Sequence, residues 1–268
     1  MQAIFLGVVQ GLTEFLPVSS SGHLVILQDL LGVQMPGLSF EVMVHGGTLV
    51  AVFLAFGEQV WYVVRGVLAV VFGKSRHPSH REAARIAVAL LVGSVPAAVA
   101  GVGLRRLFEA WFQSPSLAGL GLICTGLVLI AGGRLGRTGR GLREVGFGRA
   151  LVIGVAQAVA LVPGISRSGS TITAGLWMGL QRQAAAEFSF LLSIPAVAGA
   201  LFLDIKELVQ SPAGVEGVAL WLGAMSAAVS GYFAIRVLLR FLRTGRYYLF
   251  AYYVWAVGIL VMARQLQA

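Results

Sequence analysis

One short segment of the chain concentrates groups that bind phosphate. Between Pro163 and Thr171 the sequence sets a single arginine, Arg167, among four hydroxyl residues and two glycines. Glycine lets a ligand approach backbone N–H groups, hydroxyls donate hydrogen bonds, and a guanidinium binds phosphate oxygens through two parallel bonds. We therefore expect a phosphate clamp centred on Arg167. The hydroxyl residues expected to assist it are Ser166, Ser168 and Thr171.

A second segment, from Gln10 to His23, carries a carboxylate, three serines and a histidine. Gln10 and Glu14 lie four residues apart, so on a helix they share one face. Oxygen ligands of this kind suit Mg²⁺ or Ca²⁺, and a cation between Glu14 and a bound phosphate would separate two negative groups. The sequence therefore predicts a divalent cation as cofactor, with a protonated or hydrogen-bonded Glu14 as the alternative. For Arg167 the alternative is an ion pair with Glu14 or Glu187.

Ser19, Ser20 and Ser21 stand directly before Gly22 and His23. Their hydroxyls have the chemistry to attack phosphorus, to donate to phosphate oxygens, or to cap a helix that begins near residue 21. Because imidazole titrates near neutral pH, His23 suits an acid for a leaving phosphate or a base for a serine. A hydrogen-bonded structural histidine is the alternative.

The composition places these residues in a membrane. Hydrophobic residues make up 57% of the 268-residue chain and charged residues 12%, whereas roughly a quarter of a soluble domain is charged. The expected fold is an all-α integral membrane protein with one polytopic domain over residues 1–268. Six stretches suit a hydrocarbon core about 30 Å thick. They cover roughly 40–64, 86–104, 117–133, 184–203, 217–239 and 247–264.

The formal net charge of +9 is carried by connections between these stretches, which indicates membrane orientation and not a nucleic-acid partner. The connections 73–85, 134–149 and 240–246 are basic and are assigned to the cytoplasm, whereas the acidic connection 204–216 is assigned to the outside. The connection 105–116 should also lie outside, although it holds two arginines against one glutamate.

Two segments, 1–31 and 150–180, are apolar at both ends but interrupted by Pro, Gly and Ser. Non-helical backbone is tolerated at membrane depth only where protein or a wet cavity surrounds it, so both are expected to be re-entrant helical hairpins with polar tips. At an offset of 147 residues, 7–22 and 154–169 agree at six of 16 positions. The identical pairs are Gly7 and Gly154, Val8 and Val155, Gln10 and Gln157, Ser19 and Ser166, Ser21 and Ser168, and Gly22 and Gly169.

This agreement predicts two pseudo-repeats, about 1–133 and 150–268, joined by the basic cytoplasmic loop 134–149. Each repeat would hold one hairpin and three spans, and an odd number of crossings inverts the second repeat relative to the first. Inverted repeats commonly place a ligand near the membrane midplane, where the two tips would meet. The candidates on the apolar stretch after each hairpin are Glu41, His45 and Glu187.

At its two polar segments the chain resembles the undecaprenyl-pyrophosphate phosphatase family of bacteria, often called bacitracin-resistance proteins. One family signature is matched by Gln10, Glu14 and the run from Pro17 to His23, and the other by the run from Pro163 to Thr171. The similarity spans essentially the whole chain. Further matching runs are Phe40 to Val42 and Ala186 to Leu192.

The resemblance implies hydrolysis of the C55 undecaprenyl pyrophosphate to the monophosphate and inorganic phosphate, which recycles the lipid carrier for peptidoglycan synthesis. It also implies a divalent cation and a site on the outer, periplasmic side of the plasma (inner) membrane. By position, Ser20 corresponds to the nucleophile, Glu14 to the metal-linked carboxylate, His23 to the acid–base partner and Arg167 to the pyrophosphate clamp. Many members have glutamate where this chain has Gln10, and an amide can coordinate a metal but cannot act as a base.

The main alternative from another class is a lipid-carrier flippase or transporter, because inverted repeats and broken helices also occur in transporters. A positioned nucleophile with an acid–base partner, as in Ser20 and His23, favours hydrolysis. An acid-phosphatase-like lipid phosphatase would need an upstream Lys and Arg motif and a later His paired with Asp, and the sequence has neither. The sequence leaves open whether Ser20 or water attacks and whether the protein forms a homodimer.

Overall fold

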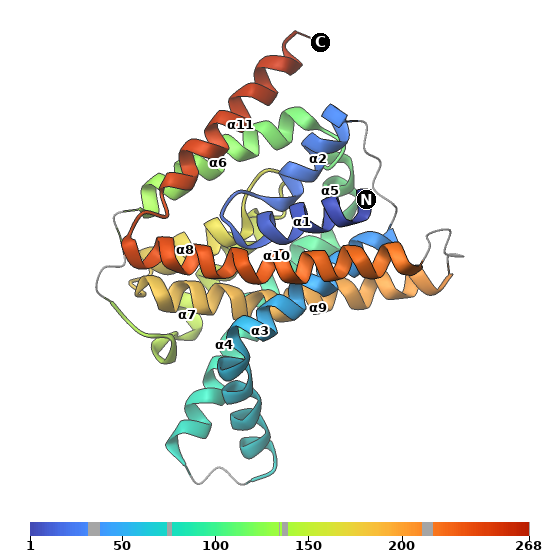
Figure 1. The fold of residues 1–268 in the computed structure, drawn as a ribbon. Helices are drawn as coiled ribbons and strands as arrows, with labels where there is room; N and C mark the ends of the chain where they lie inside the picture. The colour runs from blue at the N-terminus through green and yellow to red at the C-terminus, as the bar shows by residue number, and fades with distance from the viewer. Residues whose placement is uncertain (32–37, 74–76, 134, 136–138, 211–216, 268) are drawn as a thin grey trace.

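The computed structural model describes residues 1–31, 38–73, 77–133, 135, 139–210 and 217–267, and helices dominate these ranges (Figure 1). This confirms the expected all-α protein. The helices are α1 (Gln2–Phe15), α2 (Ser20–Leu31), α3 (Leu38–Val71), α4 (Pro78–Gly103), α5 (Arg105–Trp111), α6 (Pro115–Gly132), the short 3-10 helix η1 (Leu142–Glu144), α7 (Phe147–Val159), α8 (Arg167–Trp177), α9 (Arg182–Gln210), α10 (Gly217–Thr244) and α11 (Leu249–Gln265).

Five helices in the described ranges are long and apolar enough to cross a membrane. They cover Phe40–Val71, Pro78–Gly103, Pro115–Gly132, Arg182–Phe202 and Gly217–Thr244. The sixth predicted stretch forms α11, which has 17 residues and is shorter than these five. A multi-pass helical protein is therefore shown, and the number of six spans stays a prediction.

Each of the two interrupted segments forms a pair of helices separated by a break, as the sequence predicts. The first break, 16–19, joins α1 to α2, and the second, 160–166, joins α7 to α8. Each contains a proline, Pro17 or Pro163. Proline has no backbone N–H and cannot continue the hydrogen-bond ladder of a helix.

Glycines let the helices of the two pairs pack closely against long helices elsewhere in the chain. Helix α1 lies along α10, and α7 packs against α4 (Figure 1). A Cβ atom at Gly7 would collide with the carbonyl of Gly223, and one at Gly154 with the carbonyl of Gly93. Gly7 and Gly154 form one of the identical pairs at the offset of 147. The same packing device therefore occurs at equivalent positions of the two segments.

Aromatic packing fixes the end of α1. Helix α3 bends at Phe56, where the backbone leaves helical geometry (φ −126°, ψ 26°). The ring of Phe56 lies 5.3 Å from that of Phe190 on α9, and Phe15 meets the same ring edge-on at 5.7 Å. Phe15 and Phe190 are almost fully buried. This contact holds the last turn of α1, where Glu14 lies, against α9.

Candidate active site at two helix breaks

The two helix breaks lie against each other, although about 150 residues separate them in the sequence. A Cβ atom at Gly22 would come within 2.9 Å of the Cα atom of Gly164. The hydroxyl of Ser168 donates to the carbonyl of Leu16 at 3.2 Å. Gly164 has a positive φ of 86°, a conformation that glycine adopts without steric cost. The expectation that the two polar tips meet is therefore confirmed.

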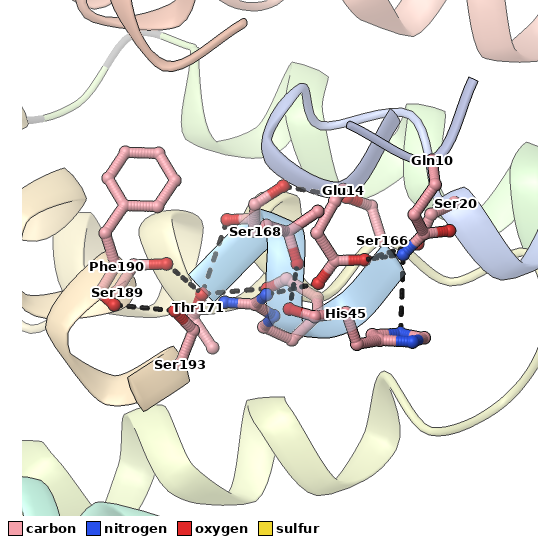
Figure 2. A network of polar contacts seen from close by, with 12 residues as sticks. Gln10, Glu14, Ser20, His45, Ser166, Ser168, Thr171, Ser189, Phe190 and Ser193 are labelled. Carbon is pink, nitrogen blue, oxygen red and sulfur yellow. Dashed lines mark hydrogen bonds and ion pairs between the residues drawn. The ribbon is translucent and has the colours of Figure 1, made fainter. Parts of the chain in front are cut away.

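Glu14 is the centre of the contact between the breaks (Figure 2). Its Oε1 atom accepts a 2.5 Å hydrogen bond from Arg167 Nη2, and its Oε2 atom accepts a 2.7 Å bond from the Ser20 hydroxyl. The Glu14 side chain is 9% exposed and that of Arg167 is 17% exposed. Of the two carboxylates considered for Arg167, the partner is Glu14. The side chain of Glu187 instead accepts a bond from Gln183 at 2.9 Å.

Gln10 links the carboxylate to α3. Its amide nitrogen donates to Glu14 Oε2 at 3.0 Å and lies 3.3 Å from His45 Nε2. Because His45 Nδ1 lies 2.8 Å from the Glu41 carbonyl, Nδ1 carries the hydrogen and Nε2 accepts from Gln10. The predicted group of Gln10, Glu14 and His45 is therefore brought together, and Glu41 reaches it through its backbone carbonyl.

The hydroxyls beside Arg167 hold the second break. Ser166 Oγ accepts the N–H of Gly169 at 3.1 Å and so caps α8, and it lies 3.2 Å from Ser168 Oγ. Thr171 donates to the Arg167 carbonyl at 2.8 Å and lies 2.6 Å from the hydroxyl of Ser189 on α9. These buried hydroxyls have partners within the protein. Their arrangement supports the backbone around Arg167, and contact with a ligand stays a prediction for them.

The first break is held in a similar way. Ser19 Oγ accepts the N–H of Gly22 at 3.3 Å and lies 3.2 Å from Ser21 Oγ. The ring of His23 turns from Ser20 toward α11: Nδ1 lies 2.8 Å from the Ser19 carbonyl and Nε2 lies 2.9 Å from the Tyr253 hydroxyl. The structure therefore shows Ser20 bonded to Glu14, and the acid–base role of His23 stays a prediction.

Known proteins are similar to this chain over nearly its whole length. Residues 3–260 match the family described as bacitracin resistance protein BacA. The chain belongs to the BacA family. Curated relatives named undecaprenyl-diphosphatase include one from Desulforapulum autotrophicum, 44% identical over 97% of this chain and 96% of the relative, and one from Desulfosudis oleivorans, 46% identical over 96% of each. A third, from Carboxydothermus hydrogenoformans, is 41% identical over 98% of this chain and 97% of the relative.

Two buried atoms of this BacA-family site have no hydrogen-bond partner among the described residues. They are Gln10 Oε1, an acceptor, and Arg167 Nη1, a donor. Buried polar atoms without partners are uncommon because each loses its bonds to water. The acceptor suits a cation and the donor suits an anion. Both belong to side chains that bond to Glu14 through another atom, so each has one hydrogen-bonding position that the described residues leave unused.

A divalent cation fits this part of the BacA-family site. No group of three or more His, Cys, Asp or Glu side chains suited to a metal is found in the described ranges. Magnesium, however, is usually held by one or two carboxylates, waters and the phosphates of a substrate. Glu14 and the Gln10 amide oxygen supply protein ligands of this kind. The fit is to a cation shared with a phosphate group.

Two residues of the site were missed by the sequence analysis. Thr125 on α6 accepts the N–H of Ser166 at 2.9 Å and donates to the carbonyl of Gly164 at 2.8 Å, so it ties the second break to α6. Tyr253 bonds to His23 as described above. Both lie inside apolar helices without a motif. The only sequence signal is a polar group within an otherwise apolar stretch.

Proposed function

We propose that this protein is an undecaprenyl-diphosphatase that removes the terminal phosphate from undecaprenyl pyrophosphate in a membrane. The observation that supports it best is the chain of contacts from Ser20 through Glu14 to Arg167. A hydroxyl, a carboxylate that accepts its hydrogen bond and a guanidinium are the groups that phosphoryl transfer by a serine requires. The names of the relatives agree with this chemistry.

In the proposed reaction the Ser20 oxygen attacks the terminal phosphorus while its proton passes to Glu14. The bond between that phosphorus and the bridging oxygen breaks, and the polyprenyl monophosphate leaves. Water then attacks the phosphoserine and releases inorganic phosphate, which restores the serine hydroxyl. Direct attack by a water bound to Glu14 would give the same products, and the geometry accommodates both routes. A role for His23 as acid for the leaving group would require its Nε2 atom to turn from the Tyr253 hydroxyl to the substrate.

Arg167 would stabilise the charge on the transferring phosphoryl group. Its Nη2 atom is bonded to Glu14 and its Nη1 atom has no partner among the described residues. A phosphate oxygen bound at Nη1 therefore need not displace the ion pair with Glu14. Donors that are already oriented toward developing charge lower the barrier without reorganisation during the reaction.

Glu14 and Gln10 would hold the divalent cation that we propose as cofactor. Glu14 and Arg167 together carry no net charge, so a bound pyrophosphate would add uncompensated negative charge in a poorly solvated site. A bound cation supplies charge neutralisation there. We expect a chelator to silence phosphate release and Mg²⁺ or Ca²⁺ to restore it. Full activity in excess chelator would remove the cation from the proposal.

We further propose that the two broken helix pairs are re-entrant hairpins in an inverted repeat, with six spans, in the plasma (inner) membrane and with the site opening to the periplasm. The repeated close contacts of Gly7 and Gly154 support the repeat. The apolar spans would hold the polyprenyl chain.

Two glycines test this topology. A Cβ atom at Gly103 or at Gly148 would meet no atom within 4 Å, so cysteine fits at both positions. In a Cys124→Ala background, an impermeant thiol reagent should label Gly103→Cys in intact cells and Gly148→Cys only after permeabilisation. The reverse pattern would contradict the proposed orientation.

The activity itself is tested by phosphate release from a long-chain polyprenyl pyrophosphate by the purified protein with Mg²⁺. We expect release by the wild type and loss in Ser20→Ala. Ser226→Ala is the matched control, because Ser226 bonds to the carbonyl of Leu222 in its own helix, α10. A folded wild type that releases no phosphate would contradict the proposal.

A further inference from the structure

Tyr253 on α11 makes a specific contact with the first helix break. Its hydroxyl lies 2.9 Å from His23 Nε2, and the two rings stack almost parallel, with centroids 5.6 Å apart and an angle of 8° between the planes. A hydrogen bond and a ring stack together fix both the distance and the plane of the imidazole. The side chains come from positions 230 residues apart in the sequence.

The partners of His23 define its tautomer. Nδ1 lies 2.8 Å from the Ser19 carbonyl, which can only accept, so Nδ1 carries the hydrogen. In the neutral ring Nε2 then has the lone pair and accepts the hydrogen of the Tyr253 hydroxyl. Without that hydroxyl, only the Ser19 carbonyl would favour this tautomer. The opposite tautomer would set an Nδ1 lone pair against the Ser19 carbonyl.

The tautomer of His23 affects the backbone at Ser19, whose carbonyl faces Nδ1. Ser19 has a φ of 67°, and within the described ranges no other residue except glycine has a positive φ. A side chain makes this conformation unfavourable, so other contacts must maintain it. The Ser19 carbonyl accepts two bonds from His23, one from Nδ1 and one from the backbone N–H at 3.2 Å. The next residue is Ser20.

Helix α11 is held independently of the tyrosine, because it packs along α6, against which α2 also packs. Arg264 forms an ion pair with Asp29 at 3.0 Å. The residue after Tyr253 is Val254, which is fully buried in an apolar cluster. The other buried members of this cluster come from the first break, α2, α6 and α11, and are Val18, Ile26, Leu122 and Val261. Tyr253 is 48% exposed, and its backbone belongs to a helix that packs along α6.

We propose that Tyr253 is a positioning residue for Ser20. It holds His23 in the tautomer with hydrogen on Nδ1, and His23 in turn maintains the left-handed turn at Ser19 that places the Ser20 hydroxyl on Glu14. The functional part of this inference rests on the proposed phosphatase activity. The structural part, the tautomer, is independent of it.

The test uses the full-length protein with nitrogen-15-labelled histidine. Nitrogen NMR shifts distinguish the two tautomers, and His23→Gln identifies the signals of His23 among the four histidines. We expect hydrogen on Nδ1 of His23 in the wild type and a larger share of the other tautomer in Tyr253→Phe, which keeps the ring stack and the Ser19 contact but loses the hydroxyl. The matched control is Tyr252→Phe, the neighbouring exposed tyrosine, whose ring meets Trp255 edge-on. It should leave the tautomer unchanged.

Kinetics test the link to Ser20. One neutral hydrogen bond changes a rate by about threefold to tenfold, so Tyr253→Phe should lower kcat by this factor with KM unchanged. Tyr253→Phe added to His23→Gln should have no further effect, because the side-chain link from residue 23 to the Ser19 carbonyl is already lost.

An unchanged tautomer in Tyr253→Phe would overturn the inference, and so would a raised KM with normal kcat, which would make Tyr253 a substrate contact. If the wild type releases no phosphate, the proposed function fails, whereas the tautomer measurement still decides the structural part.

Discussion

The two helix breaks share one scaffold and present different chemistry. In each, a serine caps the following helix by accepting the N–H of a glycine three residues on: Ser19 with Gly22 at 3.3 Å, and Ser166 with Gly169 at 3.1 Å. In each, a second serine lies 3.2 Å from the first. The residue between the two serines is Ser20 in the first break and Arg167 in the second.

This difference explains why the two breaks contribute different chemical groups to the site. Breaks with the same serine hydrogen bonds present a hydroxyl from one side and a guanidinium from the other to Glu14, which bonds to both. The backbone differs as well, because the left-handed residue is Ser19 in the first break and Gly164 in the second. A repeated scaffold therefore supplies the framework, and single residues at equivalent positions supply the proposed nucleophile and the cationic group.

The largest effect on activity is expected from removing Arg167, the cationic group of the second break. Arg167→Ala should lower kcat/KM for polyprenyl pyrophosphate by at least about 100-fold, because a charged donor to the transition state is lost and Glu14 loses its ion-pair partner. Arg236→Ala is the control, since Arg236 is an exposed arginine that bonds to Tyr232 in its own helix. A variant that stays within threefold of the wild type would show that the clamp lies elsewhere.

Gly22 and Gly169, which occupy equivalent positions, test whether the two breaks tolerate an added methyl group equally. At Gly22 an added Cβ would lie 2.9 Å from Gly164 Cα, which is backbone and cannot move aside. At Gly169 it would lie 3.2 Å from Ser166 Cβ and 3.3 Å from Leu129 Cδ2, a looser approach that a shift of a few tenths of an ångström relieves. Gly22→Ala should therefore cost about 1–3 kcal/mol of stability and much of the activity, whereas Gly169→Ala should change both little.

The measurements for this pair are the thermal unfolding midpoint in detergent and the rate of phosphate release. Both glycines lie in the first turn of a helix, so the helix propensity of alanine affects the two variants alike. Equal midpoints for the two variants would show that the breaks do not pack against each other as closely as the structure indicates.

The sequence predicted the breaks and their partnership, because Pro, Gly and Ser interrupt helices by local chemistry and the offset of 147 residues can be counted directly. The cost of an unpaired arginine in a membrane gave an ion pair with Glu14 or Glu187 as the alternative to the phosphate clamp, and the structure shows the pair with Glu14. Tyr253 and Thr125 could not be predicted, because their roles depend on which helix faces meet across more than 40 residues.

The roles of the serines were only partly predictable. Serine hydroxyls near a helix start bond to local backbone N–H groups more readily than to distant ligands. That rule assigns Ser19 and Ser166 to capping, as the structure shows. It does not distinguish Ser20, whose bond to Glu14 depends on how the chain turns at Ser19.

The smallest effects on activity are expected at Gln10 and Gln157, which occupy equivalent positions before the two breaks. Substitutions there test most directly whether the two breaks differ in function. Gln10 and Gln157 are both almost fully buried. Gln10 donates to Glu14 and has His45 as a neighbour, whereas neither amide atom of Gln157 has a partner among the described residues. Gln10→Leu should lower kcat about tenfold, as expected when a hydrogen bond to a charged group is lost. Gln157→Leu should leave kcat unchanged.

Gln157→Leu should also raise the free energy of unfolding by about 1–3 kcal/mol, because leucine has a similar size and no unsatisfied polar atoms. An increase in the thermal midpoint with normal turnover would show that only one of the two repeated amides contributes to function. A loss of turnover in Gln157→Leu would contradict this division, because it would require the second amide to act on the site through partners that appear only when substrate binds.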